Sequence, residues 1–150
     1  METIKPVILL LVAGISALVI GCTHNDGDIG GYFGTWKLEE ITVDGEEMAE
    51  YGKDMFWQFQ SSVFCMRVVL ENHNQENRWG TWYEDSGSLY VDFSHSEDGD
   101  NSVKYQPFPE THFETGLNRL EIMNFSKRRM TLEFVGSDGV IYRYKLKKWK

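Results

Sequence analysis

The side chains that most often carry out chemistry in proteins are sparse in this sequence. Four histidines, His24, His73, His95 and His112, lie far apart, and none belongs to an HxH or HExxH motif. A metal site needs ligands that converge on one point, and those motifs place two ligands on one face of an element. We therefore interpret the histidines as solvated loop residues, and we predict neither a metal site nor another cofactor.

A group of acidic residues, Ser96–Asn101 (SEDGDN), resembles a calcium-binding loop only superficially. It lacks the alternate-position oxygens and the distant glutamate of an EF-hand, so we interpret it as a solvated loop that binds no calcium. No serine lies in a nucleophile-elbow motif, and no glycine-rich loop is suited to phosphate. The sequence thus lacks these signatures of hydrolytic and nucleotide chemistry.

Cys65 is the one thiol outside the N-terminal leader, and it is the remaining candidate nucleophile. In the stretch VFCMRVVL, the alternating set that includes Phe64, Met66 and Val68 should face the interior of the protein. This parity turns Cys65 and Arg67 outward. We interpret Cys65 as a small packed hydrophobic residue, and we predict that the protein is not an enzyme.

The first 22 residues contain Lys5, an apolar run over Val7–Ile20, and Gly21 directly before Cys22. As a helix the run is about 21 Å long, short of the roughly 30 Å hydrocarbon core of a bilayer, so it is typical of a secretory signal. The stretch LVIGC resembles the lipobox of bacterial lipoproteins. This resemblance implies a signal peptide over residues 1–21, acylation of Cys22 and anchoring in a lipid bilayer, which two or more acyl chains make stable. The alternative is an ordinary secreted protein with a cysteine at its cleavage site.

Residues 22–31 are polar, contain three glycines and lack aromatic residues. Such a segment cannot bury enough apolar area to offset the entropy of ordering it, so we predict a flexible tether. Asp26 and Asp28 faintly resemble the acidic signals that export some bacterial lipoproteins to the cell surface. The implied location is the bacterial cell envelope, with the outer membrane as the expected site.

Composition limits residues 32–150 to one domain with a bulky core. The chain has five tryptophans, seven tyrosines and nine phenylalanines, and all of them lie beyond residue 31. The formal net charge of −8 argues against a nucleic-acid partner, because phosphate binding needs a basic surface. We interpret the basic stretch KLKKWK near the C-terminus as a solvated strand end.

Eight segments alternate aromatic or β-branched residues with polar ones, which is typical of strands with one buried face. They are Phe33–Val43, Met55–Gln60, Val63–Leu70, Arg78–Glu84, Ser88–Phe93, Asn118–Phe125, Met130–Val135 and Val140–Lys148. Short connections such as Ser137–Gly139 predict hairpins, in which Gly139 supplies the positive φ of a tight turn. An antiparallel meander leaves two exposed edges unless its first and last strands pair. We therefore predict an all-β fold: an eight-stranded antiparallel up-and-down barrel formed by residues 32–150.

One face of each predicted strand is apolar, which places those side chains inside the barrel. Eight-stranded barrels can hold one small ligand, so the same side chains are the candidate lining of a binding cavity. The candidate ligand-binding residues are Trp57, Phe59, Met66, Leu89, Val91, Leu132, Phe134 and Tyr144.

Two segments interrupt the strand pattern. Gly45–Asp54 could hold one or two helical turns, whereas Ser94–Gly116 has no clean period. Connections as long as the second are usually functional or disordered. Because it contains Tyr105, Phe108 and Phe113, we predict a partly packed flap over one mouth of the barrel.

The motif GTW (Gly34, Thr35, Trp36) at the start of the first strand, with the later strands and a basic residue on the last one, resembles the lipocalin and wider calycin pattern. With the lipobox, the mature chain resembles the small bacterial lipocalin-like lipoproteins, most of which have no assigned function. The resemblance implies that Gly34 lets the chain turn tightly into the strand and that Trp36 plugs the closed end of the barrel. It also implies that a cation from the last strand covers the indole, which assigns this role to Arg143, with Lys145 as a substitute.

Two functions of different classes remain open at this point. The first is a membrane-anchored binding protein whose barrel takes up a small apolar ligand without catalysis, driven by burial of apolar area. The second is a protein-interaction or inhibitor module whose barrel is filled by its own aromatic side chains, so that its loops recognise a partner. Polar groups inside the barrel would favour the first function.

Overall fold

The computed structural model describes residues 30–48, 54–94 and 105–149 of the 150-residue chain. The predicted signal peptide, Cys22 with most of the predicted tether, and the acidic loop Ser96–Asn101 lie outside the described residues. Within the described ranges, no helix has the length and apolar character needed to cross a bilayer.

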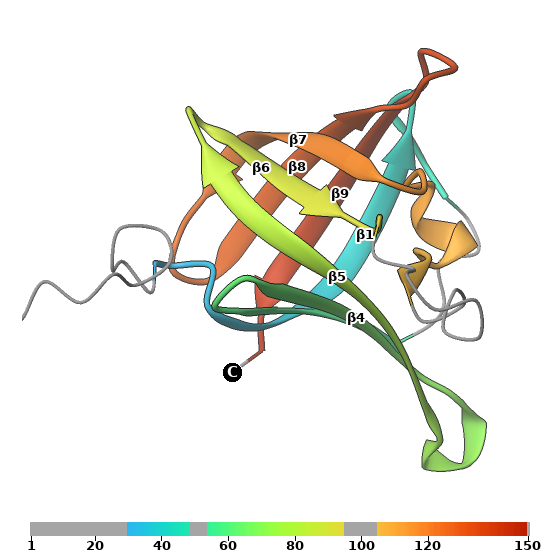
Figure 1. Ribbon diagram of the computed structural model, residues 1–150. Helices are drawn as coiled ribbons and strands as arrows, with labels where there is room; N and C mark the ends of the chain where they lie inside the picture. Colours follow the sequence, from blue (N-terminus) through green and yellow to red (C-terminus); the bar gives the residue numbers. More distant parts are fainter. Residues whose placement is uncertain (1–29, 49–53, 95–104, 150) are drawn as a thin grey trace, which may run out of the picture.

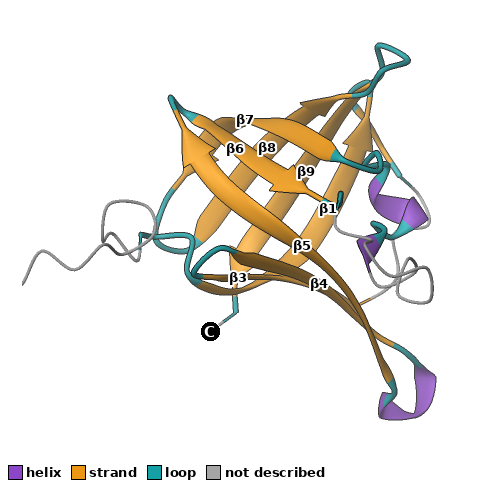
Figure 2. Ribbon diagram, in the orientation of Figure 1, coloured by secondary structure: helices purple, strands orange, loops and turns teal. Residues whose placement is uncertain are grey.

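The described residues form nine β-strands and two short 3₁₀ turns (Figures 1 and 2). The strands are β1 (Gly34–Val43), β2 (Glu46–Glu47), β3 (Asp54–Gln60), β4 (Val63–Val69), β5 (Gln75–Asp85), β6 (Ser88–Asp92), β7 (Leu117–Phe125), β8 (Arg129–Val135) and β9 (Ile141–Lys148). The turn η3 (Glu71–His73) joins β4 to β5, and η5 (Pro109–Thr111) lies between β6 and β7.

From β3 onward each strand pairs antiparallel with the next one, and the sheet closes because β1 pairs with both β3 and β9. The closing register runs from Trp36 opposite Lys148 to Val43 opposite Tyr142. Closure removes the two terminal edges that an open meander would expose. The predicted eight-stranded antiparallel barrel is therefore confirmed, formed by β1 and β3–β9, with β2 as a short addition beside β1.

The chain after β1 forms a hairpin where the sequence suggested helical turns over Gly45–Asp54. Asp44 and Gly45 both have positive φ, at 49° and 89°, and this two-residue turn lets β2 pair with the end of β1. The prediction of helix is wrong for the described start of this segment, because Asp-Gly is a strong hairpin signal. Residues 49–53 lie outside the described ranges.

The inner face of the barrel is apolar and the outer face is largely polar or charged. In β9, for example, Tyr142, Tyr144 and Leu146 are buried, and exposed residues alternate with them. Among the described residues, the buried core cluster runs from Tyr32 to Leu146, so residues 30–149 contain a core of their own. This part of the chain is therefore expected to fold without the segment that precedes it.

β5 is longer than predicted, and its two halves have different partners. Its second half pairs with β6, from Thr81 opposite Asp92 onward, whereas its first half pairs, among the described strands, with β4 alone. The change occurs at Gly80, where an added Cβ would lie 2.6 Å from the carbonyl oxygen of Asp92. Glycine permits this close approach of two backbones. The free part of the β4–β5 hairpin extends away from the barrel wall (Figure 1).

Trp36 closes the end of the barrel at which β1 begins, which we call the base. Its side chain is fully buried, and its Nε1 donates a hydrogen bond of 2.8 Å to the carbonyl oxygen of Tyr32. Gly34 has a φ of 114°, a left-handed conformation that favours glycine, and it turns the chain into β1. The glycine and the tryptophan of the GTW motif thus occupy the positions that the resemblance implies.

Lys148 is the cation that lies over Trp36. Its Nζ is 4.5 Å from the centre of the indole ring, and it donates hydrogen bonds to the carbonyl oxygens of Gly31 and Phe33. Burial lowers the pKa of its ammonium group below the ordinary value. Lys148 thus fastens the segment that leads into the barrel to the end of its last strand.

The assignment of this role to Arg143 or Lys145 is corrected by the structure. Both residues have the outward parity of β9, and they form surface ion pairs instead. Arg143 lies 2.6 Å from Glu133, and Lys145 lies 2.8 Å from Glu40. A side chain on the outer face cannot reach the indole inside the base, whereas Lys148 has the inward parity and stands at the rim.

We predict that Lys148→Met lowers the free energy of unfolding by about 2 kcal/mol, because it removes the cation over the indole and the hydrogen bonds to two carbonyl oxygens. Arg143→Met is the matched control, and its exposed ion pair should contribute less than about 1 kcal/mol. Urea denaturation of both variants measures the difference. Equal losses would contradict the special role of Lys148.

Candidate functional site

All eight predicted lining residues lie on the inner face of the barrel. Seven of them have 0% exposed surface, and Phe134 is 5% exposed. They are contributed by β3, β4, β6, β8 and β9, and therefore surround the interior from most sides. The parity of the sequence places them together correctly, and their role in binding a ligand stays a prediction.

Aromatic rings fill part of this interior. The ring centre of Trp57 lies 5.7 Å from that of Phe64 and 5.3 Å from that of Tyr144. Phe59 lies 5.1 Å from Phe64 and 5.2 Å from Trp82, in the second case edge to face. These are the separations of directly packed rings. The protein's own side chains therefore occupy this part of the barrel.

A ring from the connection between β6 and β7 enters the same interior. Phe113 is only 7% exposed, and its ring centre lies 5.4 Å from that of Trp57, 5.6 Å from that of Phe134 and 5.1 Å from that of Tyr144. These three residues belong to the predicted lining. Phe113 thus occupies a place that the sequence assigns to a ligand, and we call residues 108–113 the plug.

Polar contacts hold the plug against β9. The Tyr144 hydroxyl donates a hydrogen bond to the carbonyl oxygen of Thr111, which is fully buried. The Thr111 hydroxyl donates in turn to the carbonyl oxygen of Phe108, at 2.7 Å. His112 ends η5 in a left-handed conformation, with a φ of 59°, and its ring stacks on Tyr142 at 4.6 Å. The described part of the predicted flap is therefore packed, as expected.

The segment between the plug and β7 is pinned by Asn118. Its buried amide donates to the carbonyl oxygens of Glu114, at 2.8 Å, and Gly116, at 3.1 Å, and accepts from the backbone N–H of Glu114. The N–H of Phe93 donates to Gly116 across the start of the connection, at 2.9 Å. The carboxylate of Glu114 accepts a hydrogen bond from the N–H of Ser137, which lowers the pKa of Glu114. These bonds fix the segment that follows the plug without using the plug's aromatic rings.

A charged pair, Glu76 and Arg78, lies on the inner face of β5 beside the plug. The register sets Glu76 opposite Val68 and Arg78 opposite Met66, two inward residues of β4. Nη2 of Arg78 lies 2.7 Å from the Glu76 carboxylate, and its guanidinium carbon lies 5.0 Å from the ring centre of Phe108. The sequence did not predict this pair. The Arg78 side chain is 14% exposed and the Glu76 side chain 45% exposed, so the pair lies at the edge of the interior, next to the plug.

The two described histidines have different surroundings. His73 is exposed in η3, as expected, whereas His112 is half-buried in the plug and is not a solvated residue. Within residues 30–48, 54–94 and 105–149, no group of three or more His, Cys, Asp or Glu side chains is placed to hold a metal ion. His24 and His95 lie outside these ranges.

Cys65 lies on the outer face of β4, as its parity predicts, yet it is only 2% exposed. Its neighbours in the adjacent strands are Gln58 and Trp79. Burial raises the pKa of the Cys65 thiol to about 11, and nearby Arg67 opposes this only in part. At neutral pH the thiol is protonated, and a protonated thiol is a poor nucleophile.

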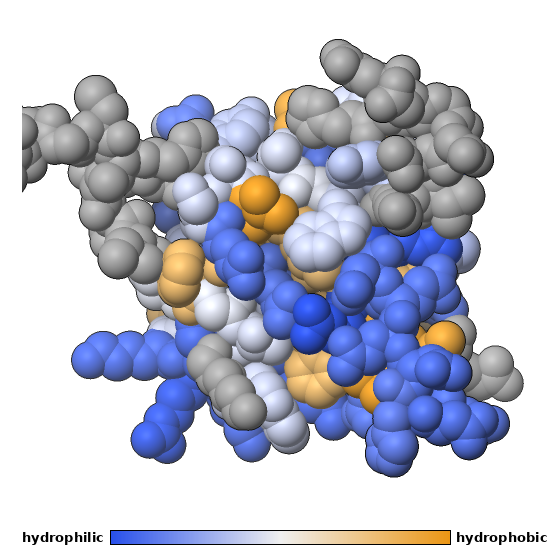
Figure 3. Space-filling model, turned by 60° about the horizontal axis from the view of Figure 1, so that its bottom comes forward, coloured by the Kyte–Doolittle hydropathy of each residue, from blue (hydrophilic) through white to orange (hydrophobic). Residues whose placement is uncertain are grey.

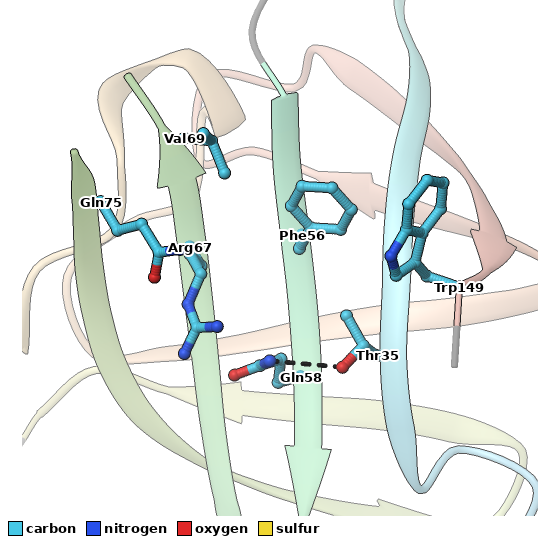
Figure 4. Close-up of a pocket in the computed structure, with 7 residues that line it drawn as sticks. All are labelled: Thr35, Phe56, Gln58, Arg67, Val69, Gln75 and Trp149. Carbon is cyan, nitrogen blue, oxygen red and sulfur yellow. Dashed lines mark hydrogen bonds between the residues drawn. The ribbon is translucent and has the colours of Figure 1, made fainter. Parts of the chain in front are cut away.

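The outer wall of the barrel carries a groove of about 230 Å³ beside Cys65 (Figure 4). Two aromatic rings, Phe56 and Trp149, lie toward its β1 side, with ring centres 5.5 Å apart. Arg67 and Gln75 lie toward β4 and β5, and Gln58 of β3 donates a hydrogen bond of 3.3 Å to the hydroxyl of Thr35 on β1. The groove is lined by Thr35, Phe56, Gln58, Arg67, Val69, Gln75 and Trp149. None of these residues belongs to the predicted lining.

The closed barrel, its sealed base and its aromatic interior define a small calycin-type β-barrel. Residues 17–148 match the family model of the Lipocalin-like domain, so the chain belongs to this family. The resemblance carried by the GTW motif is therefore confirmed at the level of the barrel. No curated protein matches the chain.

Two solved bacterial structures resemble the chain over most of their lengths. A lipocalin-like protein from Bacteroides uniformis aligns with 80% of this chain and 100% of its own, at 14% identity and a TM-score of 0.56. An uncharacterized protein from Bacteroides eggerthii aligns with 79% of this chain and 99% of its own, at 17% identity and a TM-score of 0.58. At these identities the likeness shows the fold alone.

Tyr144→Phe should loosen the plug while leaving the barrel folded. Burial raises the pKa of the Tyr144 hydroxyl well above its ordinary value, so the group is a protonated donor at neutral pH. Its loss should lower the free energy of unfolding by about 1 kcal/mol. Hydrogen exchange measured by mass spectrometry should become faster at Thr111 and His112. Tyr90→Phe, on the outer face, is the control, and equal exchange in the two variants would contradict the role of Tyr144.

The Cys65 thiol should resist alkylation in the folded domain. With a pKa of about 11, its thiolate fraction at pH 8 is lower by about 100-fold than that of an ordinary cysteine, and the iodoacetamide rate should fall by a similar factor. The same chain in denaturant is the control, because unfolding restores the ordinary pKa. A folded-state rate within a few-fold of the unfolded rate would contradict the assignment of Cys65 as an inert packed residue.

Proposed function

We propose that this protein is a membrane-anchored lipoprotein whose lipocalin-like barrel binds a small apolar molecule at the place now occupied by Phe113. The observation that carries the proposal is the position of the Phe113 ring among three predicted lining residues. The ring comes from a connection between strands, not from the barrel wall. It can therefore leave the interior without breaking a strand pairing.

Exchange of the plug for a ligand is energetically feasible. Phe113 gives up apolar contacts with the wall when it leaves, and an apolar ligand restores contacts of the same kind. The net gain comes from the ligand's own surface, at about 25 cal/mol for each Å² removed from water. The polar bonds from Asn118 to Glu114 and Gly116 lie beyond the plug and can persist during the exchange.

The charged pair on β5 indicates how a ligand would be oriented. Glu76 and Arg78 stand on the inner face beside Phe108, where the plug meets the wall. A ligand with an apolar body and one polar group would place the body near Trp57 and Tyr144 and the polar group near this pair. A charged pair at the edge of the interior supports a binding site over a barrel filled for stability alone.

The anchor and the location rest on the sequence. The apolar run, Gly21 and Cys22 support acylation of Cys22 and attachment to a bilayer of the bacterial cell envelope, with the outer membrane as the expected site. The mechanism is passive, and the buried, protonated thiol of Cys65 supports a function without catalysis. Nothing in the proposal requires a cofactor.

A second function is favoured by a specific observation. The packed rings of Trp57, Phe59, Phe64 and Phe113 leave the interior well filled without any ligand. A filled barrel would serve as a rigid support for its loops, in a protein-interaction or inhibitor module. The two functions differ in one property, which is whether Phe113 gives way to a ligand.

Binding of the neutral apolar dye N-phenyl-1-naphthylamine to residues 30–150 tests this property, with native mass spectrometry in a lipid and metabolite extract as a second measurement. Phe113→Leu should bind the dye about tenfold more tightly, because a smaller plug competes less well for the interior. Trp57→Glu should abolish binding. Phe56→Leu, on the outer face, is the matched control for the loss of one ring.

An adduct that is displaced by the dye would identify the natural ligand class. Absence of binding in the wild-type domain and in folded Phe113→Leu would contradict the binding function and favour the filled barrel. Circular dichroism establishes that each variant is folded.

A further inference from the structure

Three chain segments meet at the base of the barrel: the segment that leads into β1, the β7–β8 turn, and the end of β9. Lys148 donates hydrogen bonds from its Nζ to the carbonyl oxygens of Gly31 and Phe33, and from its N–H to that of Arg128 at 2.8 Å. Gly31 lies so close to Phe125 that an added Cβ would be 2.6 Å from the ring. Residues 30–33 therefore lie beside the β7–β8 turn (Figure 1).

Cations that pair with no described carboxylate gather at this point. Lys127 and Arg128 in the β7–β8 turn, and Lys147 near the end of β9, are exposed and form no ion pair with any described carboxylate. Their neighbour Arg129 differs, because it lies 3.4 Å from Glu39. Arg129 pairs with Lys147 in the β8–β9 register, which brings the turn and the end of β9 side by side.

Exposed apolar side chains accompany these cations. Phe33 is 45% exposed, Met123 is 52% exposed, and Phe125 is 36% exposed. The Phe125 ring also packs on Tyr32, with ring centres 4.3 Å apart, so it is fixed in place. On the side of the molecule that Figure 3 brings forward, small apolar patches alternate with hydrophilic side chains, and long hydrophilic ones project at its left edge. We define the basal face as Phe33, Met123, Phe125, Lys127, Arg128 and Lys147.

The basal face differs in charge from the rest of the chain. The formal net charge of the protein is −8, which alone would repel it from an anionic surface. A local group of cations that pair with no described carboxylate, with apolar residues between them, is the combination that binds the interface of an anionic bilayer. Residues 22–29 separate the predicted acylation site from the described barrel, and eight residues span at most about 27 Å. The basal face is therefore the part of the barrel that an anchored Cys22 holds nearest to lipid.

We propose that the basal face docks on the anionic lipid bilayer in which Cys22 is anchored. The plug contacts Tyr142 near the start of β9, whereas Lys148 at the end of β9 lies at the base, so this docking would turn the plug away from the membrane. This inference rests on the proposed anchoring, and it adds a second contact that does not involve the acyl chains. Lys127, Arg128 and Lys147 would lie among the lipid headgroups. Phe33, Met123 and Phe125 would enter the interface between the headgroups and the acyl chains.

Co-sedimentation of residues 30–150 with vesicles tests the docking without the anchor. The domain should bind vesicles that contain phosphatidylglycerol and should not bind vesicles of phosphatidylcholine alone, and salt should weaken the binding. The variant Lys127→Gln/Arg128→Gln/Lys147→Gln should bind about 100-fold more weakly, because each Lys or Arg near an anionic surface contributes roughly fivefold. Phe33→Gln/Met123→Gln should also weaken binding, by a factor that depends less on salt.

A matched control separates the basal face from net charge. Asn72→Asp/Asn74→Asp/Gln75→Glu changes the net charge by the same amount through exposed, nearly isosteric side chains at the tip of the β4–β5 hairpin. This variant should bind anionic vesicles almost as well as the wild type. Equal losses in the two triple variants, or equal binding by the wild type and the glutamine variant, would overturn the proposal. The proposal would also be overturned if the wild-type domain did not bind anionic vesicles but did bind beads coated with polyglutamate.

Failure of this test is distinguishable from failure of the proposed function. Acylation is measured separately, as a diacylglyceryl mass on the N-terminal peptide of the full chain. Dye binding is measured separately in the barrel interior. Hydrogen exchange gives an independent view of the docking, because vesicles should protect residues 125–128 and leave the plug unchanged.

Discussion

The pairing of β1 with β9 is the interaction on which the rest of this structure depends. It closes the meander, and it sets the end of the last strand beside the segment that leads into the first. Lys148 reaches Trp36 only because this register places the two residues opposite each other. Closure also fixes the volume of the interior, which the aromatic residues of the inward faces must then fill at the density of a protein core.

Alternation along the chain was sufficient to predict this architecture. Strands such as β3 and β8 keep a strict period of two, so their limits and their buried faces follow from the sequence. The same parity contained two signals that the sequence analysis did not use. Lys148 shares the inward parity of Leu146, and Arg78 shares that of Trp82. The inward positions of Lys148 and Arg78 were not predicted, because charged side chains are expected on the outside of a barrel. The residues that neutralise or cover them cannot be identified from the sequence alone.

The sequence predicts that the segment containing the plug packs on the barrel, but it does not predict which side chain enters the interior. Its segment has no period, so its aromatic content indicates that it packs without indicating where. The position of Phe113 depends on contacts with β3, β8 and β9, which lie far from it along the chain. The hairpin at Asp44 and Gly45 is a different case, because its two-residue Asp-Gly signal is present in the sequence. Cys22 and the leader are a third case, because the sequence pattern there predicts cleavage and acylation of the chain and not the fold of the barrel.

The plug packs on side chains of β9 but takes no part in the ladder that closes the barrel. The plug belongs to the connection between β6 and β7, whereas the ladder joins the backbones of β1 and β9. Withdrawal of Phe113 therefore breaks a few side-chain contacts and leaves every ladder hydrogen bond in place. Such local opening has a free energy well below that of global unfolding, and loop motions of this size occur in nanoseconds to microseconds. Under the proposed binding function, a ligand could thus enter and leave the barrel many times within the lifetime of a single folded molecule.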